Sequence, residues 1–262
     1  MKALHMKGVI TAGLTLVGPL TIAFALALAG TAGARAADDA DEIVKRADLV
    51  RGPADPFTLK MTVTAYKGSK VLNSTSVLVN THDFSRSIVE FVAPPRDAGR
   101  KLLRVSENMW VRIPASRRSI RITAQQRLLG QASNADVMGT NYASDYSSKL
   151  LGEEEVTAND SAKVNCYKLE LVKKTIAASY YRLIYWVDKA TYRPVRTEFY
   201  TQTGKLIKYA QFGKFGNALG AVRPGRVVIV NAVNADEYTV LDIQEYGNSR
   251  LPVAQYTEAA LN

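Results

Sequence analysis

Cysteine and histidine are scarce in this chain of 262 residues, which has one cysteine and two histidines. Cys166 has no second cysteine to pair with, so no disulfide can form within the chain. His5 lies in an N-terminal segment that we expect to be removed, which leaves only His82 for a zinc site or a catalytic dyad. The G-x-S-x-G, P-loop and G-x-G-x-x-G motifs are also missing. We therefore expect no enzyme, with no catalytic residue, metal site or cofactor.

Long apolar runs are absent except at the N-terminus, where residues 9–29 follow Lys2 and Lys7 and precede an Ala34-Arg35-Ala36 pattern. This arrangement predicts a secretory signal peptide over residues 1–36, cleaved near Ala36. The mature chain, residues 37–262, is then a single domain in the periplasm. An uncleaved membrane anchor is the alternative, because the run reaches the roughly 20 residues that span a bilayer. No cysteine follows the signal, so a lipoprotein is not expected.

Acidic residues are too few to balance the basic ones, and the formal net charge is +10. Removal of Lys2, Lys7 and Arg35 with the signal lowers this charge to about +7. A basic exported protein meets anionic lipid headgroups or lipid-bearing proteins. Nucleic acid is not expected as a partner, since an exported chain seldom meets it and no recognition motif is present.

Apolar residues alternate with polar ones along most of the mature chain, after one amphipathic helix predicted at residues 38–51. Twelve segments have this two-residue period or a β-like composition, and no helices alternate with them. They are residues 57–65, 71–80, 86–92, 101–106, 109–113, 119–123, 164–173, 180–188, 192–200, 205–212, 226–233 and 238–246. The pattern predicts a large antiparallel sheet, sandwich or barrel built from consecutive hairpins.

Residues 125–152 do not fit this pattern, being too long for a simple loop and too irregular for a strand. We expect short helices here and a lid or binding element, because the apolar residues of the segment need something to cover. Leu128, Leu129, Met138, Tyr142 and Tyr146 are its candidate ligand-binding residues.

Several polar residues outside this segment have simple interpretations. His82 is expected at the solvated end of a hairpin strand, Cys166 is expected to be structural, and residues 153–155, three glutamates, are expected in a solvated loop. Trp110 and Trp186 lie on separate predicted strands and either line a cavity or fill the core.

Four arginines gather near one predicted hairpin: Arg112, Arg117, Arg118 and Arg121. Guanidinium groups suit phosphate or carboxylate, so the cluster is a candidate site for an anionic headgroup. The alternative is a charged hairpin tip that faces water.

In their order and spacing, several segments resemble those of the outer-membrane lipoprotein-sorting proteins, which are relatives of the periplasmic carrier LolA. The resemblance covers nearly all of the mature chain. It rests on residues 91–99 (FVAPPRDAG), 102–103 (LL), 109–114 (MWVRIP), 117–118 (RR), 138–145 (MGTNYASD), 151–153 (LGE), 186–188 (WVD), 192–195 (YRPV), 200, 204–206 (GKL), 256–257 (YT) and 261. One departure is that Thr140 and Asn141 stand where the family often has Ser-Asp.

The resemblance implies an unclosed barrel of about eleven antiparallel strands, wrapped around helices that plug a hydrophobic cavity. Such a protein would carry a lipid or an acylated lipoprotein across the envelope as a monomer, with an inner-membrane permease as a possible partner. The ligand-binding residues would be Trp110, Leu128, Leu129, Met138, Tyr142, Tyr146 and Trp186. The family also contains envelope sensors, so a sensor or adaptor that regulates rather than transports is the alternative.

Overall fold

The computed structural model describes residues 39–115 and 118–261. The predicted signal peptide, residues 1–36, and Arg117 lie outside the described residues. Within those residues, no helix is both long enough and apolar enough to cross a bilayer.

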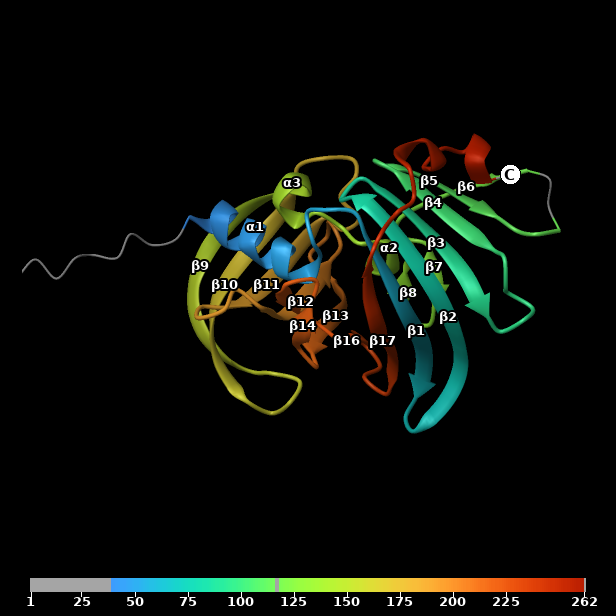
Figure 1. Cartoon of the computed structure of the whole chain (residues 1–262). Helices are drawn as coiled ribbons and strands as arrows, with labels where there is room; N and C mark the ends of the chain where they lie inside the picture. Colours follow the sequence, from blue (N-terminus) through green and yellow to red (C-terminus); the bar gives the residue numbers. More distant parts are fainter. Residues whose placement is uncertain (1–38, 116–117, 262) are drawn as a thin grey trace, which may run out of the picture. The chain divides into compact units, whose positions relative to one another are not determined.

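Strands dominate the described chain, and helices are few and short (Figure 1). The helices are α1 (Ala40–Arg51), α2 (Asn134–Met138), α3 (Tyr142–Asp145), η1 (Val253–Gln255) and η2 (Ala259–Leu261). The strands are β1 (Phe57–Lys67), β2 (Lys70–Asp83), β3 (Arg86–Ala93), β4 (Lys101–Val105), β5 (Asn108–Arg112), β6 (Ile120–Ile122), β7 (Arg127–Leu129), β8 (Ala132–Ser133), β9 (Tyr146–Thr157), β10 (Lys163–Lys173), β11 (Arg182–Asp188), β12 (Pro194–Tyr200), β13 (Leu206–Gly213), β14 (Gly216–Ala218), β15 (Ala221–Arg223), β16 (Arg226–Asn231) and β17 (Glu237–Asn248).

One antiparallel sheet contains thirteen of these strands, in the order β6-β5-β4-β3-β2-β1-β17-β16-β13-β12-β11-β10-β9. Consecutive hairpins build each half, and the pairing of β1 with β17 joins the halves from Phe57↔Asn248 to Lys67↔Glu237. Among the described residues β6 and β9 form the two edges and do not pair with each other. The sheet is therefore an unclosed barrel, as predicted, with thirteen strands rather than about eleven.

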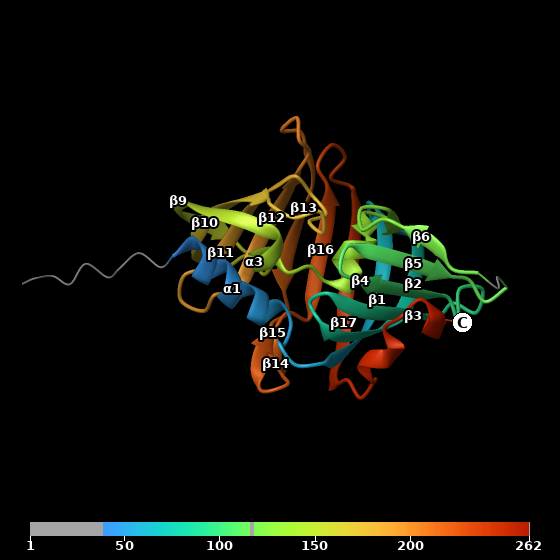
Figure 2. The same ribbon diagram turned by 90° about the horizontal axis from the view of Figure 1, so that it is seen from above.

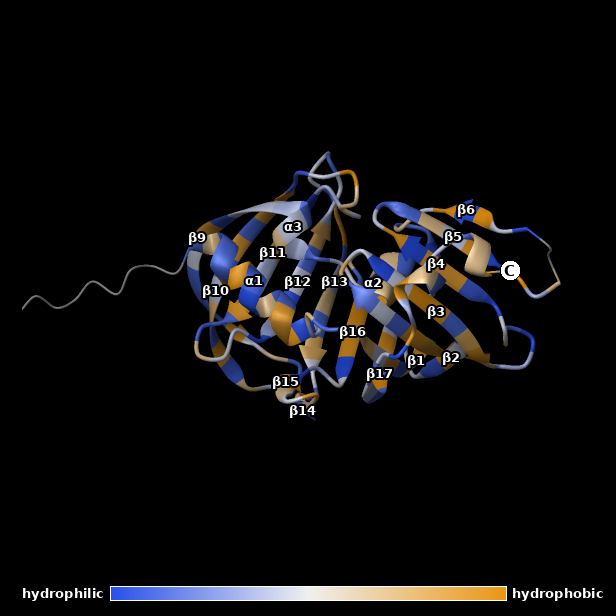
Figure 3. Ribbon diagram, turned by 45° about the horizontal axis from the view of Figure 1, so that its top comes forward, coloured by the Kyte–Doolittle hydropathy of each residue, from blue (hydrophilic) through white to orange (hydrophobic). Residues whose placement is uncertain are grey.

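One face of the sheet carries the main core, because the strands place every second side chain on it. On β1, for example, Met61, Val63 and Ala65 are buried and the residues between them are not. Hydrophobic and hydrophilic bands alternate along the strands in Figure 3. Smaller clusters lie on the opposite face, one around Cys166 and one around Leu103.

Helix α1 packs against β9, β11, β12 and α3 (Figures 1 and 2). It begins where the Asp39 side chain caps the first turn, and its acidic residues lie in that turn, as the helix dipole favours. Ile43, Val44 and Ala47 form its buried face, and the helix ends before Gly52. The predicted helix at residues 38–51 is thus confirmed within the described residues.

All twelve predicted strands are present, whereas β7, β8, β14, β15 and the long strand β9 were not predicted. Its residues Glu153, Glu154 and Glu155 are exposed on an edge strand rather than in a solvated loop. Sequence alone did not identify the strand because glycine and consecutive glutamates are uncommon in strands. His82 also differs from its prediction, since its ring is only half-exposed and lies 5.6 Å from the ring of Tyr256.

Candidate functional site

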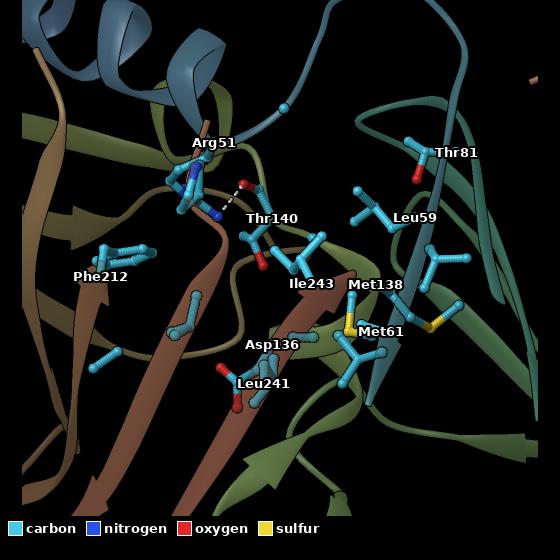
Figure 4. A pocket seen from close by; sticks show the side chains of 18 of the residues that line it. Arg51, Leu59, Met61, Thr81, Asp136, Met138, Thr140, Phe212, Leu241 and Ile243 are labelled. Atoms are coloured by element: carbon cyan, nitrogen blue, oxygen red, sulfur yellow. Dashed lines mark hydrogen bonds between the residues drawn. The ribbon is translucent and has the colours of Figure 1, made fainter. Parts of the chain in front are cut away.

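An apolar cavity of about 120 Å³ lies between the core face of the sheet and the segment around α2 (Figure 4). The strands supply most of its wall, and α2 and the following residues supply the rest. The apolar lining includes Leu59, Met61, Val79, Val137, Met138, Phe199, Ala210, Phe212, Val227, Ile229, Leu241 and Ile243. An engineered apolar cavity of roughly 150 Å³ binds benzene, so the cavity in this form holds only a small apolar group.

Helix α2 covers this cavity as a short plug. Its N-terminus is fixed by a capping box, in which Ser133 Oγ accepts a bond from the Asp136 amide and the Asp136 carboxylate accepts one from the Ser133 amide at 2.7 Å. Val137 and Met138 turn inward, and Gly139 ends the helix at φ +80°. A helix of five residues has little stability of its own, so its position depends on contacts with the rest of the fold.

A buried ion pair anchors the N-terminal end of α2. Lys208, on β13, pairs with Asp136, and both side chains are at least nine-tenths buried. The Lys208 ammonium also donates to the Gln131 carbonyl at 3.0 Å. Because Ser133 holds the same carboxylate, the charge of Lys208 is compensated by a partner that is itself fixed.

A buried arginine anchors the C-terminal end. Arg104, on β4, donates to the Gly139 carbonyl, and its Nε donates to Ser106 at 3.0 Å. Ser87, on β3, donates to the Met138 carbonyl at 3.3 Å. Arg104 is almost fully buried, and this burial lowers its pKa.

A third cation, Arg51, joins the end of α1 to the residues after α2. Its guanidinium donates to the Thr140 carbonyl at 3.0 Å, lies 3.9 Å from the Tyr142 ring centroid and pairs with Asp48 at 2.7 Å. Asp48 in turn accepts a bond from the Ala143 amide at 2.9 Å. Figure 4 shows Arg51 reaching Thr140 beside the apolar lining. Three cations from three elements therefore hold residues 136–143.

Chemically, the site is apolar and its tyrosines stay neutral. Burial raises the pKa of Tyr142 to about 12 and raises that of Tyr146 further. Cys166 is buried outside the cavity, and burial raises its thiol pKa to about 12. Across residues 39–115 and 118–261, the His, Cys, Asp and Glu side chains form no group that could hold a metal ion. The arrangement suits the binding of an apolar group.

Comparison with protein families and solved structures places this fold. A family model described as "uncharacterized protein"-like matches residues 83–262. The structure is similar to that of a LolA superfamily protein from Nitrosomonas europaea, with a TM-score of 0.77, 29% identity, and coverage of 84% of this chain and 98% of that chain. The chain belongs to the LolA-like family.

Two further solved structures share the LolA-like fold. One is a domain named as an outer membrane lipoprotein-sorting protein from Vibrio parahaemolyticus, with a TM-score of 0.71, 18% identity, and coverage of 85% of this chain and 97% of that chain. The other is a DUF1329 family protein from Desulfovibrio piger, with a TM-score of 0.71, 24% identity, and coverage of 85% and 98%. A comparison with curated proteins found no match.

Three of the predicted ligand-binding residues of this LolA-like chain line the cavity: Met138, Tyr142 and Tyr146. Leu128 and Leu129 do not line it; they are half-buried and pack against the main core. Leu128 instead borders a separate hollow of about 280 Å³. They belong to the β7–β8 hairpin, which precedes α2 in the chain, so these two positions of the predicted segment lie outside the cavity lining.

Neither tryptophan lines the cavity, so of the two alternatives, cavity wall or core, the structure favours packing within the apolar clusters of the sheet. Trp186 packs on the opposite face of the sheet, where its indole donates to Glu154 at 3.1 Å. Trp110 packs against the cluster of Leu103, Tyr256 and Leu261. The two-residue period is the reason, because the neighbouring residues of each tryptophan occupy the core face.

The described arginines of the predicted cluster also lie away from the cavity lining. Arg112 donates to the Leu261 carbonyl at 2.8 Å, and Arg121 contacts Asn108 and lies 5.5 Å from the Trp110 ring centroid. Arg118 is exposed. Arg112 and Arg121 thus support the C-terminal segment and the β5–β6 hairpin.

The sequence interpretation missed the charged residues that hold α2. Asp48 lies on the apolar face of α1, and Arg104 and Lys208 occupy core-face positions on their strands. The sequence feature that could have identified them is a charged residue at a position where the period predicts an apolar one, because a buried charge needs a partner.

Proposed function

We propose that this LolA-like protein is a periplasmic carrier that binds a lipid or a lipidated protein and moves it across the envelope. The observation that carries this proposal is the apolar cavity, which is covered by a five-residue helix held largely through polar bonds. The name of the Vibrio parahaemolyticus domain, a lipoprotein-sorting protein, supports the same function. Binding requires no covalent bond to be made or broken.

An acyl chain has a strong reason to enter such a cavity. Each methylene costs about 0.8 kcal/mol in water, so a long chain needs an apolar container to cross an aqueous space. The volume of about 120 Å³ is too small for such a chain. Loading therefore requires α2 to move away from Met61 and Leu241, and breaking the bonds of Arg51, Arg104 or Lys208 would release it.

The proposal also includes export of the chain, its monomeric state and a membrane partner. Residues 1–36 would direct export and be removed near Ala36, and residues 37–262 would act as one monomeric domain. An inner-membrane permease would supply or accept the cargo. The alternative function is a sensor or adaptor of the same fold that regulates rather than transports.

Native mass spectrometry with lipid extraction tests the carrier function on protein exported to a bacterial periplasm and purified without detergent. We expect a bound lipid or acylated peptide at one copy per chain, on a chain that begins near Ala37. Ala210→Met fills the cavity with apolar atoms and should abolish this binding, as should Met138→Glu. Leu72→Glu alters an exposed residue and should leave it intact.

A wild-type protein that carries no lipid, and that takes up none when titrated with a monoacyl lipid, would count against the carrier and favour the sensor or adaptor. Lipid retained by Ala210→Met would mean that the lipid binds outside the apolar cavity. Circular dichroism of each variant checks that the sheet is intact.

A further inference from the structure

A second, polar hollow of about 460 Å³ adjoins the apolar cavity, and we call it the polar chamber. It lies among the ends of β10, β12 and β13 and the β7–β8 hairpin. Tyr180 lines both spaces. The Lys208–Asp136 ion pair spans the boundary, because Asp136 lines the apolar cavity and Lys208 lines the polar chamber.

The polar chamber carries positive charge without matching negative charge. Arg127, Lys173 and Lys208 line it, and no aspartate or glutamate does. Within the described part of the chain, neither Arg127 nor Lys173 forms an ion pair with a carboxylate. Two uncompensated cations and one whose partner lies across the boundary therefore face the same space, which favours an anion.

The remaining lining suits a polar group rather than an apolar one. Tyr180, Tyr181 and Tyr200 border the chamber together with threonine and glutamine side chains. Hydroxyl and amide groups of this kind supply hydrogen bonds to phosphate or carboxylate oxygens, although the Tyr200 hydroxyl already donates to Glu198 at 2.6 Å. The volume lies within the range of pockets that hold small molecules.

We propose that the polar chamber binds the anionic headgroup of an amphiphile whose acyl chain occupies the apolar cavity. This inference rests on the proposed function and names its substrate class. The phosphate or carboxylate of the headgroup takes the place of Asp136 on Lys208. Asp136 keeps its bonds to Ser133 at 2.7 and 2.8 Å, so its carboxylate is not left without donors.

This exchange links binding of the headgroup to release of helix α2. The Lys208–Asp136 pair is the anchor of α2 on β13, so an anion on Lys208 loosens the helix while the chain enters beneath it. An uncharged amphiphile gains only the burial of its chain and must displace the ion pair without replacing it. The carrier therefore prefers anionic amphiphiles over neutral ones of the same chain length.

Isothermal titration of the full mature chain compares three probes: myristoyl lysophosphatidate, monomyristoylglycerol and glycerol phosphate. We expect lysophosphatidate to bind at least about tenfold more tightly than monomyristoylglycerol, and glycerol phosphate to bind far more weakly than both. In the variant Arg127→Gln/Lys173→Gln, the two amphiphiles should bind with nearly equal affinity, and the affinity for monomyristoylglycerol should stay at its wild-type value.

A matched control removes the same charge elsewhere. Lys60→Gln/Lys70→Gln alters two exposed lysines of the β1–β2 hairpin and should keep the wild-type preference. Equal wild-type affinity for both amphiphiles would overturn the headgroup site and leave the carrier function standing, whereas binding of neither would overturn both. A preference that survives Arg127→Gln/Lys173→Gln, or glycerol phosphate binding as tightly as lysophosphatidate, would also overturn the headgroup assignment.

Discussion

Asp48 shows how burial and ion pairing compete at a single residue of this fold. Its side chain is buried, with Arg51 at 2.7 Å and the Ala143 amide at 2.9 Å. Burial raises its pKa from the ordinary value of 3.8 to about 6, although Arg51 and the backbone bond act in the opposite direction. The ionised carboxylate therefore costs stability at neutral pH even though it has good partners.

Substitution of Asp48 by Asn tests which effect on stability is larger, burial of the carboxylate or its pairing with Arg51. Between pH 3.8 and about 6, the folded chain holds a proton that the unfolded chain has released. The stability of the wild type relative to Asp48→Asn should therefore rise as pH falls through this window, by up to about 3 kcal/mol. Urea denaturation of both proteins at several pH values measures the difference. A wild type that loses stability relative to the variant on acidification would show that the bond to Arg51 outweighs burial.

For individual residues, the two-residue period was the only sequence feature that predicted where a side chain lies. The period fixes which face of a strand a residue occupies, so it separates Trp186 from its core-face neighbours Tyr185 and Val187. The resemblance to a family does not do this, because it indicates a cavity without assigning faces. The contacts of Lys208 and Arg104 with α2 join segments far apart in the chain, and no local pattern encodes them.

The β7–β8 hairpin depends on one glycine at its turn. Gly130 has φ +56°, and a Cβ atom at this position would lie 2.6 Å from Ala65 Cβ and closer still to Thr239 Oγ1. The adjacent Gln131 amide donates to Thr239 Oγ1 at 2.7 Å. The hairpin thus lies directly against β1 and β17, and this contact places Ser133 for the capping box of α2.

Gly130→Ala should therefore destabilise the protein more than a glycine replacement at a similar backbone angle elsewhere. Gly68 is the matched control, since its φ is +55° and nothing lies within 4 Å of the added Cβ. Gly68→Ala should cost about 1 to 2 kcal/mol from backbone strain alone. Gly130→Ala should cost about 1 to 3 kcal/mol more, from overpacking. Chemical denaturation measures both, and equal costs would mean that the hairpin shifts freely on the sheet.

At the level of elements, the strands that bury one face were predictable and the rest were not. β1 and β2 alternate clearly because one face lies in the core and the other does not. β9 has mostly exposed residues, so little alternation marks it, and β7 and β8 are too short to show a period. The short helices expected within residues 125–152 are present as α2 and α3, but their boundaries depend on caps such as Ser133 and Asn141.

For the whole molecule, the small volume of the cavity implies that ligand binding changes the mobility of one segment. With the LolA-like arrangement described above, an acyl chain fits only if α2 leaves its place. Hydrogen exchange of residues 134–138 should therefore become several-fold faster when monomyristoylglycerol binds, while β10 and β11 keep their protection.

Hydrogen-exchange mass spectrometry of the free and loaded protein measures this response. Ala210→Met, which fills the cavity, is the control and should show no change on addition of the same ligand. Slower exchange of residues 134–138 in the loaded protein would contradict the expectation, because it would mean that the chain binds with α2 in place.

Because the sheet is not closed, it has a long unpaired strand edge, which a closed barrel would not have. β9 is twelve residues long and has no strand partner on its outer side among the described residues. Free edges of this length can pair with another copy of the same chain and begin aggregation. Each of the glutamates at residues 153–155 pairs with a lysine of its own chain, which is Lys189, Lys168 or Lys163. Charged side chains of both signs therefore lie along this edge. The glutamates that obscure the two-residue period of β9 in the sequence therefore also make its edge charged, which disfavours pairing with a second copy of the chain.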